Sequence, residues 1–345
     1  MTTASKIDPQ WHALLAAAMP EKQRLELSLK AAEDDRHRLT VTVTLRAGPT
    51  RELEIALSQG MAQTLPPLQS IRVQQCLRAW LPWLLKLHQR IRCDYSLNLS
   101  MCDGGQAGMP SMDSQDWTAL IPDLYTMQAA VKREKYGKPM AFPRFLARWQ
   151  KRRPQIFWRG STTGMQRGGS IQDVAGLQAN PRVQISLRHR NHEACNIKIS
   201  RVVQMDPAFS SAAKEWLNTA GILAPPVQES TFGNYRYYPD IPGNALAWGT
   251  IFKHLRGCLV LRAPHKRALY HYRLMQPWKH YIPVEPDFSD LDTAVAWAEA
   301  HPEQAAWIAW CGHWVAHRYL RQIGFHFSDA VLPHIQPVIP LQLRE

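Results

Sequence analysis

Several features that would assign this chain of 345 residues to a special class are missing from its sequence. No apolar run is long enough to span a bilayer, and the longest, residues 79–85, contains Pro82. The six cysteines show no paired spacing and no C-x-x-C motif, which indicates reduced thiols rather than a disulfide framework. The first residues lack the apolar core of a signal peptide. We therefore expect a cytoplasmic protein.

Acidic residues are in short supply. The 41 lysines and arginines exceed the 28 acidic residues, which gives a formal net charge of +13 at pH 7. Such an excess favours an acidic partner, either nucleic acid, anionic lipid or phosphorylated sugars. No nucleic-acid reader motif accompanies the charge, so we expect no nucleic-acid partner. The hydrophobic fraction of 45% is ordinary for a globular protein, and the length suggests about two domains.

The common phosphate-binding signatures, the P-loop and G-x-G-x-x-G, are also missing. In their place, residues 158–164 form a turn rich in glycine and hydroxyl groups directly after the apolar run 155–157, and Arg167 follows. A strand that opens into such a turn supplies backbone N–H groups, small side chains and guanidinium groups. These are the parts that can hold a diphosphate. An ordinary polar turn is the alternative interpretation.

Strand and helix patterns alternate along the chain, which is typical of an α/β fold with parallel sheets. In the first part we expect strands over residues 38–46, 52–57 and 94–100 and a helix over 73–90. In the second part we expect strands over residues 155–158, 183–187, 235–238, 259–262 and 279–284. A helix is predicted over 248–256, and a long helix begins at the capping box 289–292. We assign an N-terminal domain to residues 1–150, a second domain to 151–330 and a tail to 331–345.

Four motifs follow one another in the second half of the chain. They are the turn with Trp158, Arg159, Gly160, Ser161, Thr163 and Arg167; the Tyr-rich strand leading to Asp240, Gly243 and Asn244; the helix with Trp248, Phe252 and Leu255; and residues 274–284 followed by 287–291. Their order resembles glycosyltransferase family 90. That group includes protein O-glucosyltransferases, capsule-associated xylosyltransferases and bacterial lipopolysaccharide-modifying enzymes. Before residue 155 the resemblance is thin.

The resemblance implies a GT-B fold, in which two Rossmann-like domains face each other across a cleft. The first domain would lie on the acceptor side and the second would bind the donor nucleotide. It also implies an inverting, metal-independent transfer from a nucleotide sugar, commonly a UDP-sugar, with no cofactor. Similarity to the bacterial subgroup implies a lipopolysaccharide or surface-glycan acceptor at the inner membrane. An anionic membrane surface is a further candidate partner, because it would attract the basic runs 151–153 and 188–190.

Asp103 is the candidate catalytic base. It follows the predicted strand 94–100, and ligands bind at strand ends in open α/β sheets. The family base also occupies a strand-end loop before the Arg-Gly-Ser motif. The alternative is a plain turn at Asp103, because Asp-Gly favours turns. Asp113 and Asp116 are the fallback candidates.

The other candidate site residues are expected to bind the donor. Ser161 and Arg167 are carried over from the family motif, Gly160 and Thr162 would offer backbone N–H groups, and Trp248 would border the sugar or base pocket. Many eukaryotic members have an Arg where this chain has Ile251, and Lys253 could replace its charge. Together with Cys258, which replaces a serine of the family, Ile251 leaves open an inactive scaffold or binding protein.

No metal is expected from these patterns. The only D-x-D sequence, Asp290 to Asp292, belongs to the predicted helix cap. The sets His189/His192/Cys195 and His313/His317 have spacings that metal sites use, but neither has an H-E-x-x-H frame. The helical spacing of Trp307, Trp310 and Trp314 favours core packing over sugar stacking.

Overall fold

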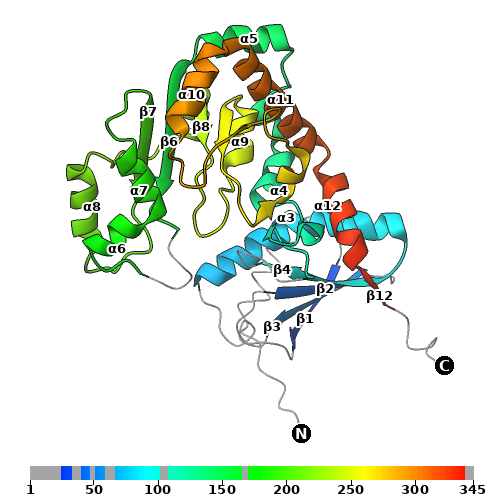
Figure 1. Ribbon diagram of the computed structural model, residues 1–345. Helices are drawn as coiled ribbons and strands as arrows, with labels where there is room; N and C mark the ends of the chain where they lie inside the picture. The colour runs from blue at the N-terminus through cyan, green and yellow to red at the C-terminus, as the bar shows by residue number, and fades with distance from the viewer. Residues whose placement is uncertain are drawn as a thin grey trace, which may run out of the picture. The chain divides into compact units, whose positions relative to one another are not determined.

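The structure is a computed structural model that describes residues 25–32, 40–46, 51–58, 67–101, 108–164 and 170–338 (Figure 1). The chain divides into two compact units. Unit 1 comprises Met1–Lys132, Arg267–Tyr270 and Gln322–Glu345, and unit 2 comprises Arg133–Lys266 and His271–Arg321. The boundary therefore differs from the predicted one at residue 150. The helix α5 (Phe142–Gln150) belongs to unit 2, because its buried face packs against α11 (Pro302–Arg321).

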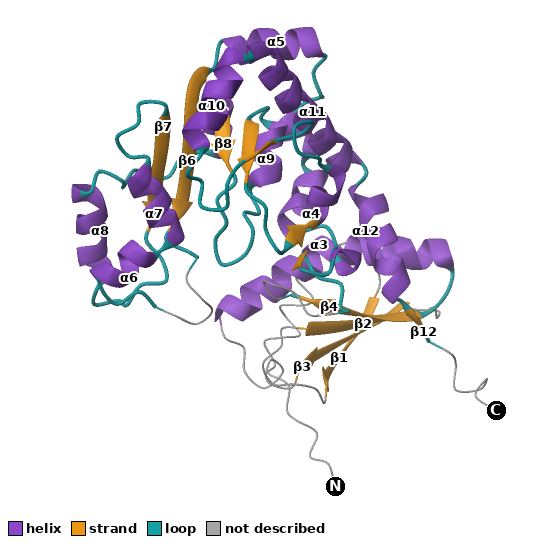
Figure 2. Cartoon of the chain, viewed as in Figure 1, coloured by secondary structure: helices purple, strands orange, loops and turns teal. Residues whose placement is uncertain are grey.

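The sheet of unit 1 is mixed (Figure 2). Its order is β1-β3-β2-β4-β12, from strands Leu25–Ala32, Arg51–Ser58, Thr40–Arg46, Tyr95–Ser100 and Gln336–Pro337. The pair β1–β3 is parallel, and the pairs β2–β3, β2–β4 and β4–β12 are antiparallel. This sheet departs from the expected Rossmann pattern, because the link from β2 to β3 is too short for the crossover that parallel neighbours need. The predicted strands are nevertheless confirmed.

Helices accompany this sheet. Those in the described part of unit 1 are α3 (Pro67–Ile91), α4 (Leu124–Val131) and α12 (Ile323–Val331), and α3 packs against both of the others. The predicted helix 73–90 is confirmed within α3, where Leu77, Trp80 and Leu84 are fully buried. A short ribbon pairs β5 (Asp113–Ser114) with β10 (Ala268–Leu269). No helix among the described residues has the length and apolarity to cross a bilayer.

Unit 2 is built on a parallel sheet. Its order is β11-β9-β8-β6-β7, from strands Ile282–Pro283, Leu259–Arg262, Tyr235–Pro239, Arg153–Ser161 and Cys195–Arg201. The accompanying helices are α5, α6 (Val174–Ala179), α7 (Pro181–Arg188), α8 (Ser210–Thr219), α9 (Thr250–Leu255), α10 (Leu291–Ala300) and α11. Because all five strands are parallel, their carboxyl ends lie at one edge of the sheet, where ligands bind in such folds. The expected α/β class is confirmed.

Short 3₁₀ helices occur in both units. They are η1 (Trp117–Ala119), η2 (Arg133–Tyr136), η3 (Glu229–Asn234), η4 (Tyr270–Leu274) and η5 (Leu332–His334).

Two local predictions in unit 2 were wrong. Residues 183–187 form helix α7 and not a strand, because the Asn180 side chain accepts the N–H groups of Arg182 and Val183 and Pro181 opens the first turn. The capping box at 289–292 does not form either. Asp290 precedes α10, but its carboxylate accepts the backbone N–H of Glu285.

Two of the three tryptophans of α11 are not core residues, whereas Trp310 is half-buried and packs against the core of unit 2. Trp307 is 47% exposed and Trp314 is 38% exposed, which contradicts the prediction of core packing. The indole N–H groups of Trp310 and Trp314 both donate to the carbonyl of Met140, at 2.7 and 3.0 Å. These side chains therefore cover the segment before α5 and leave aromatic surface open to solvent.

Candidate functional site

The polar turn after β6 lies at the carboxyl edge of the parallel sheet in unit 2, as the sequence pattern predicts. The parallel strands β8 and β9 also end at this edge, so the segments that follow them begin there. The hydroxyl groups of Ser161 and Thr163 lie 3.2 Å apart there, and both residues are half-buried. Two neighbouring hydroxyls beside basic side chains can hold an anionic group.

Arg182 fixes the shape of this turn. Its guanidinium donates to the carbonyls of Pro242 at 2.8 Å and Ile241 at 3.1 Å. It also donates to the carbonyl of Ser161 at 3.1 Å and the hydroxyl of Thr163 at 2.7 Å. Burial lowers the pKa of Arg182 to about 10, which still leaves the side chain charged at neutral pH. Arg182 was missed because the sequence pattern placed it at the start of a strand.

The loops after β6 and β8 are tied to each other by a hydrogen bond from backbone to side chain and by close packing. The N–H of Gly164 donates to Oδ1 of Asn244 at 2.8 Å. At Gly243, a β-carbon would come within 2.9 Å of both Thr163 Oγ1 and the Arg182 guanidinium, so only glycine fits between them. Asn244 and Gly243 therefore order the turn, and their roles are structural.

The predicted backbone donors of the turn are engaged elsewhere. The N–H of Thr162 donates to the carbonyl of Arg201, and its buried hydroxyl donates to the carbonyl of Val203. The expectation that Thr162 offers a free N–H is therefore wrong. Gly160 lies inside β6, paired with Ile199, and the ring of Trp158 fills the space that a β-carbon would need. Both residues shape the turn instead.

Two cations of the family motifs have structural contacts. Arg159 donates to the carbonyls of Trp158 and Asn196, at 2.8 and 3.0 Å. Lys253 is 7% exposed, and its amino group lies 4.0 Å from a carboxylate oxygen of Glu229 and 4.0 Å from the ring centroid of Phe232. Its burial lowers the pKa of Lys253. Glu229 is half-buried and pairs more closely with Arg256, at 2.7 Å, so Lys253 shares this carboxylate, and its role at the diphosphate stays a prediction.

Arg262 is a second cation that sequence reasoning missed. It ends β9 at the carboxyl edge, is half-buried, and its guanidinium carbon lies 3.3 Å from the Tyr272 ring centroid. The guanidinium makes no hydrogen bond to residues that the structure describes. Next to it, the buried carboxylate of Asp240 accepts the hydroxyls of Thr250 and Tyr272, each at 2.5 Å. Burial raises the pKa of Asp240, and the charge of Arg262 opposes that rise.

The candidate base and the second phosphate ligand stay predictions, because Asp103 and Arg167 lie outside the described residues. The fallback bases have other partners. The carboxylate of Asp116 accepts the backbone N–H and the hydroxyl of Thr118, and these hydrogen bonds lower the pKa of Asp116. Asp113 is fully buried, with Arg267 at 3.5 Å. Trp248 is half-buried just before α9, next to the carboxyl edge.

Residues 144–322, more than half of the chain, match the family model of Glycosyl transferase family 90. The chain belongs to this family.

Curated relatives match over shorter stretches of this family 90 protein. Protein O-glucosyltransferase 3 of Homo sapiens is 32% identical over 90 residues, which cover 26% of this chain and 18% of the relative. Protein O-glucosyltransferase 2 of Danio rerio is 31% identical over 100 residues, 29% of this chain and 20% of the relative. The chain thus spans only about a fifth of the length of these relatives.

Two solved glycosyltransferase structures are also similar. One is the C-terminal domain of the glycosyl transferase group 1 family protein LpcC from Francisella tularensis, with 9% identity and a TM-score of 0.31 over 50% of this chain and 91% of that one. The other is WaaG, a glycosyltransferase involved in lipopolysaccharide biosynthesis. It has 15% identity and a TM-score of 0.32, and the match covers 61% of this chain and 55% of WaaG. At these scores the family assignment rests on the sequence match.

Proposed function

We propose that this family 90 protein is an inverting, metal-independent glycosyltransferase that moves a sugar from a UDP-sugar to a lipopolysaccharide or surface-glycan acceptor. The observation that carries the proposal is the polar turn at the carboxyl edge of the parallel sheet. There Arg182 orders Ser161 and Thr163, and Arg262 ends the strand after next in the same sheet. Hydroxyl and guanidinium groups at this edge suit a nucleotide diphosphate.

The transfer needs one displacement at the anomeric carbon. In our proposal, Asp103 takes the proton of the acceptor hydroxyl while the acceptor oxygen forms its bond to that carbon. The bond from the carbon to the donor phosphate breaks, and its electron pair leaves with the diphosphate. Arg262, Arg167 and the hydroxyls of Ser161 and Thr163 stabilise the charge that develops on the diphosphate. The GT-B arrangement of the two units stays a prediction.

The alternative of an inactive scaffold rested on Ile251 and Cys258. Both are buried, with 0% and 1% exposure, and the thiol of Cys258 donates to the carbonyl of Phe232 at 3.3 Å. Both side chains pack in the core, so their difference from the family residues does not remove a charged or hydroxyl group from the turn after β6. This placement supports an enzyme.

Calorimetry with UDP in the presence of EDTA tests the donor site. We expect micromolar binding, a free energy of about −8 kcal/mol, and a loss of about 10–100-fold in Arg262→Ala, because a charged hydrogen bond to phosphate disappears. Arg153→Ala is the matched control: Arg153 also lies over a tyrosine ring, but it begins β6 at the opposite edge. If the wild type binds none of UDP, GDP and CMP, the result supports the alternative of an inactive scaffold.

A surface formed by α5 and α11 suits an anionic membrane. We call it the α5–α11 surface; its exposed residues include the cations Lys138, Arg144 and Arg148 and the aromatic residues Trp307 and Trp314. The cations border a pocket of about 450 Å³ that contains no acidic side chain. Cations beside exposed tryptophans are typical of proteins that bind the membrane interface. We propose that this surface holds the enzyme at the inner face of the membrane.

Vesicle binding tests this surface. Replacing Arg144 and Arg148 by Ala removes two charges, each worth about 1 kcal/mol near an anionic membrane, so we expect about 30-fold weaker binding to phosphatidylglycerol vesicles. The double variant Lys214→Ala with Lys266→Ala loses the same charge outside the α5–α11 surface and outside the basic runs, and it should bind like the wild type. Equal losses in both variants would mean that net charge alone attracts the protein.

A further inference from the structure

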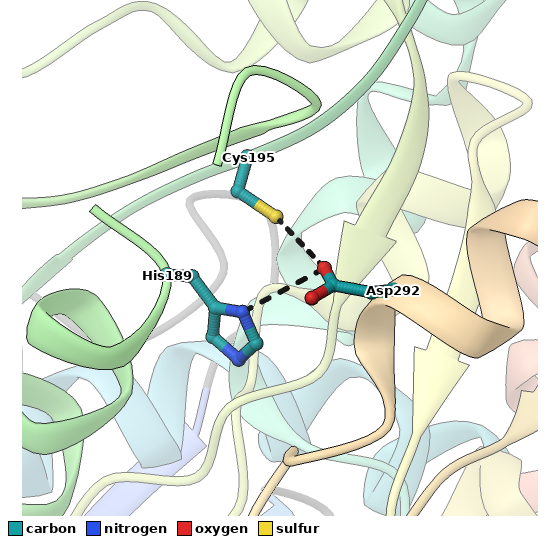
Figure 3. A group of neighbouring side chains, drawn as sticks. All are labelled: His189, Cys195 and Asp292. Atoms are coloured by element: carbon teal, nitrogen blue, oxygen red, sulfur yellow. Dashed lines mark hydrogen bonds and ion pairs between the residues drawn. The ribbon is translucent and has the colours of Figure 1, made fainter. Parts of the chain in front are cut away.

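The structure brings together three side chains that the sequence separates widely. His189 ends α7, Cys195 begins β7, and Asp292 lies in the first turn of α10 (Figure 3). Their nearest ligand atoms, the imidazole Nδ1, the sulfur and a carboxylate oxygen, all lie within 4.8 Å of one another. Asp292 Oδ1 is 3.8 Å from His189 Nδ1 and 3.8 Å from Cys195 Sγ. His189 and Cys195 are buried and Asp292 is exposed.

The hydrogen bond made by Nε2 of His189 determines whether Nδ1 has a lone pair that can bind a metal ion. Nε2 lies 2.9 Å from the carbonyl oxygen of Phe288 inside the protein, so it must carry a proton to donate. In the neutral ring Nδ1 then has a free lone pair, and this lone pair lies on the side of the Asp292 carboxylate. A metal-binding histidine is held in the same way, with its other nitrogen donating to a backbone carbonyl.

The contacts of Asp292 Oδ1 in the absence of a cation are long. The thiol of Cys195 donates to it at 3.8 Å, and His189 Nδ1 lies 3.8 Å from the same oxygen, which is too long for a hydrogen bond from nitrogen. A divalent cation would instead bind the lone pair, the thiolate and the carboxylate together, releasing the thiol proton to solvent.

We propose that His189, Cys195 and Asp292 bind one Zn²⁺ ion. One nitrogen, one sulfur and one oxygen ligand form a donor set that suits zinc, and the tetrahedral geometry would need ligand atoms about 3.3–3.6 Å apart. The two contacts of Asp292 Oδ1, at 3.8 Å each, need to shorten by only a few tenths of an ångström, and the His189–Cys195 pair, which lies within 4.8 Å, needs to close by up to about 1 Å. Water would complete the tetrahedron. His192 Nε2 lies 3.6 Å from Asp292 Oδ1 and would orient that carboxylate from outside.

The ion would have a structural role. Cys195 begins β7, whereas the polar turn lies beside the carboxyl end of that strand at Arg201, a distance of six residues or about 20 Å. At Cys195, zinc would fasten the start of α10 to the end of α7 and the start of β7. It would therefore stabilise unit 2 without contacting the sugar donor, which is compatible with a metal-independent transfer.

Metal analysis and a cobalt spectrum test the site. The full chain, purified without a histidine tag and washed after addition of zinc, should retain about one Zn²⁺ per chain by elemental analysis, as expected for a structural zinc site. Cobalt exchanged into the protein should give a thiolate charge-transfer band in the near ultraviolet. Zinc should also raise the Tm of the protein.

Matched variants decide the assignment. Asp292→Asn and Cys195→Ala should each weaken zinc binding by at least about 100-fold, since even the loss of an outer partner of a ligand costs 10–100-fold. Cys195→Ala should also abolish the cobalt band. Asp287→Asn and Cys258→Ala, an exposed aspartate and a buried cysteine outside the cluster, should bind like the wild type. Less than a tenth of an equivalent of zinc in the wild type, or full binding by Asp292→Asn and Cys195→Ala, would overturn the proposal.

Discussion

Replacing Asp103 by Asn should lower kcat by about 10²–10⁴-fold, because a positioned general base contributes that much to a proton transfer. The substitution keeps the size of the side chain and removes only its ability to take the proton. UDP should bind the variant as tightly as it binds the wild type, since the donor diphosphate is held by residues of unit 2. Steady-state rates with a UDP-sugar, together with calorimetry for UDP, measure the two effects separately.

Asp116→Asn is the control for this experiment. Asp116 is the fallback candidate that is only half-buried, and hydrogen bonds from Thr118 lower the pKa of its carboxyl, which makes it a weak base. We expect its rate to stay within a few-fold of the wild type. A full rate in Asp103→Asn combined with a large loss in Asp116→Asn would move the base to Asp116. Large losses in both would point to a defect in the fold of unit 1.

Replacing Arg182 by Met should destabilise unit 2 by about 3 kcal/mol, because three buried carbonyls and one hydroxyl lose a charged hydrogen-bond donor. Methionine keeps much of the volume of the side chain, so the loss reports hydrogen bonds rather than a cavity. UDP binding should fall sharply as well, since Ser161 and Thr163 lose the group that orders them. Urea unfolding gives the stability, and calorimetry gives the binding.

Arg159→Met provides the comparison for Arg182. Arg159 also donates to backbone carbonyls, at Trp158 and Asn196, but it has no contact with the hydroxyls of the turn. Its loss should reduce stability less and leave UDP binding close to that of the wild type. If both variants lose UDP binding to the same degree, the ordering role of Arg182 is wrong and general destabilisation explains the result.

Many elements of the fold could be predicted from local sequence. The strands β6, β8 and β9 appear as short apolar or aromatic runs, and the alternation of β2 and β4 predicted their extended backbone. The sheet edge that carries the turn after β6 followed from the same patterns, because the carboxyl ends of parallel strands meet. Helix α7 was missed since its Asn180 cap and Pro181 outweigh an apolar pattern compatible with a strand.

The roles of individual cations could not be predicted in this way. Lys253 and Arg262 both belong to the family 90 region, yet Lys253 is buried beside the ring of Phe232, whereas Arg262 ends a strand at the open edge. Only the packing around each side chain distinguishes a charge that serves the core from one that can meet a ligand. Arg182 likewise gains its role from carbonyls that lie 59 and 60 positions further along the chain.

The sequence by itself determined the family, the α/β class and the strand that leads into the polar turn, because motifs and periodicity are properties of neighbouring residues. The tertiary structure decided which groups meet. It engaged Thr162 in backbone contacts, ordered Ser161 and Thr163 through Arg182, and brought Cys195 to Asp292 across 97 positions of sequence. Contacts at that separation arise from strand order and helix packing, which no local pattern specifies.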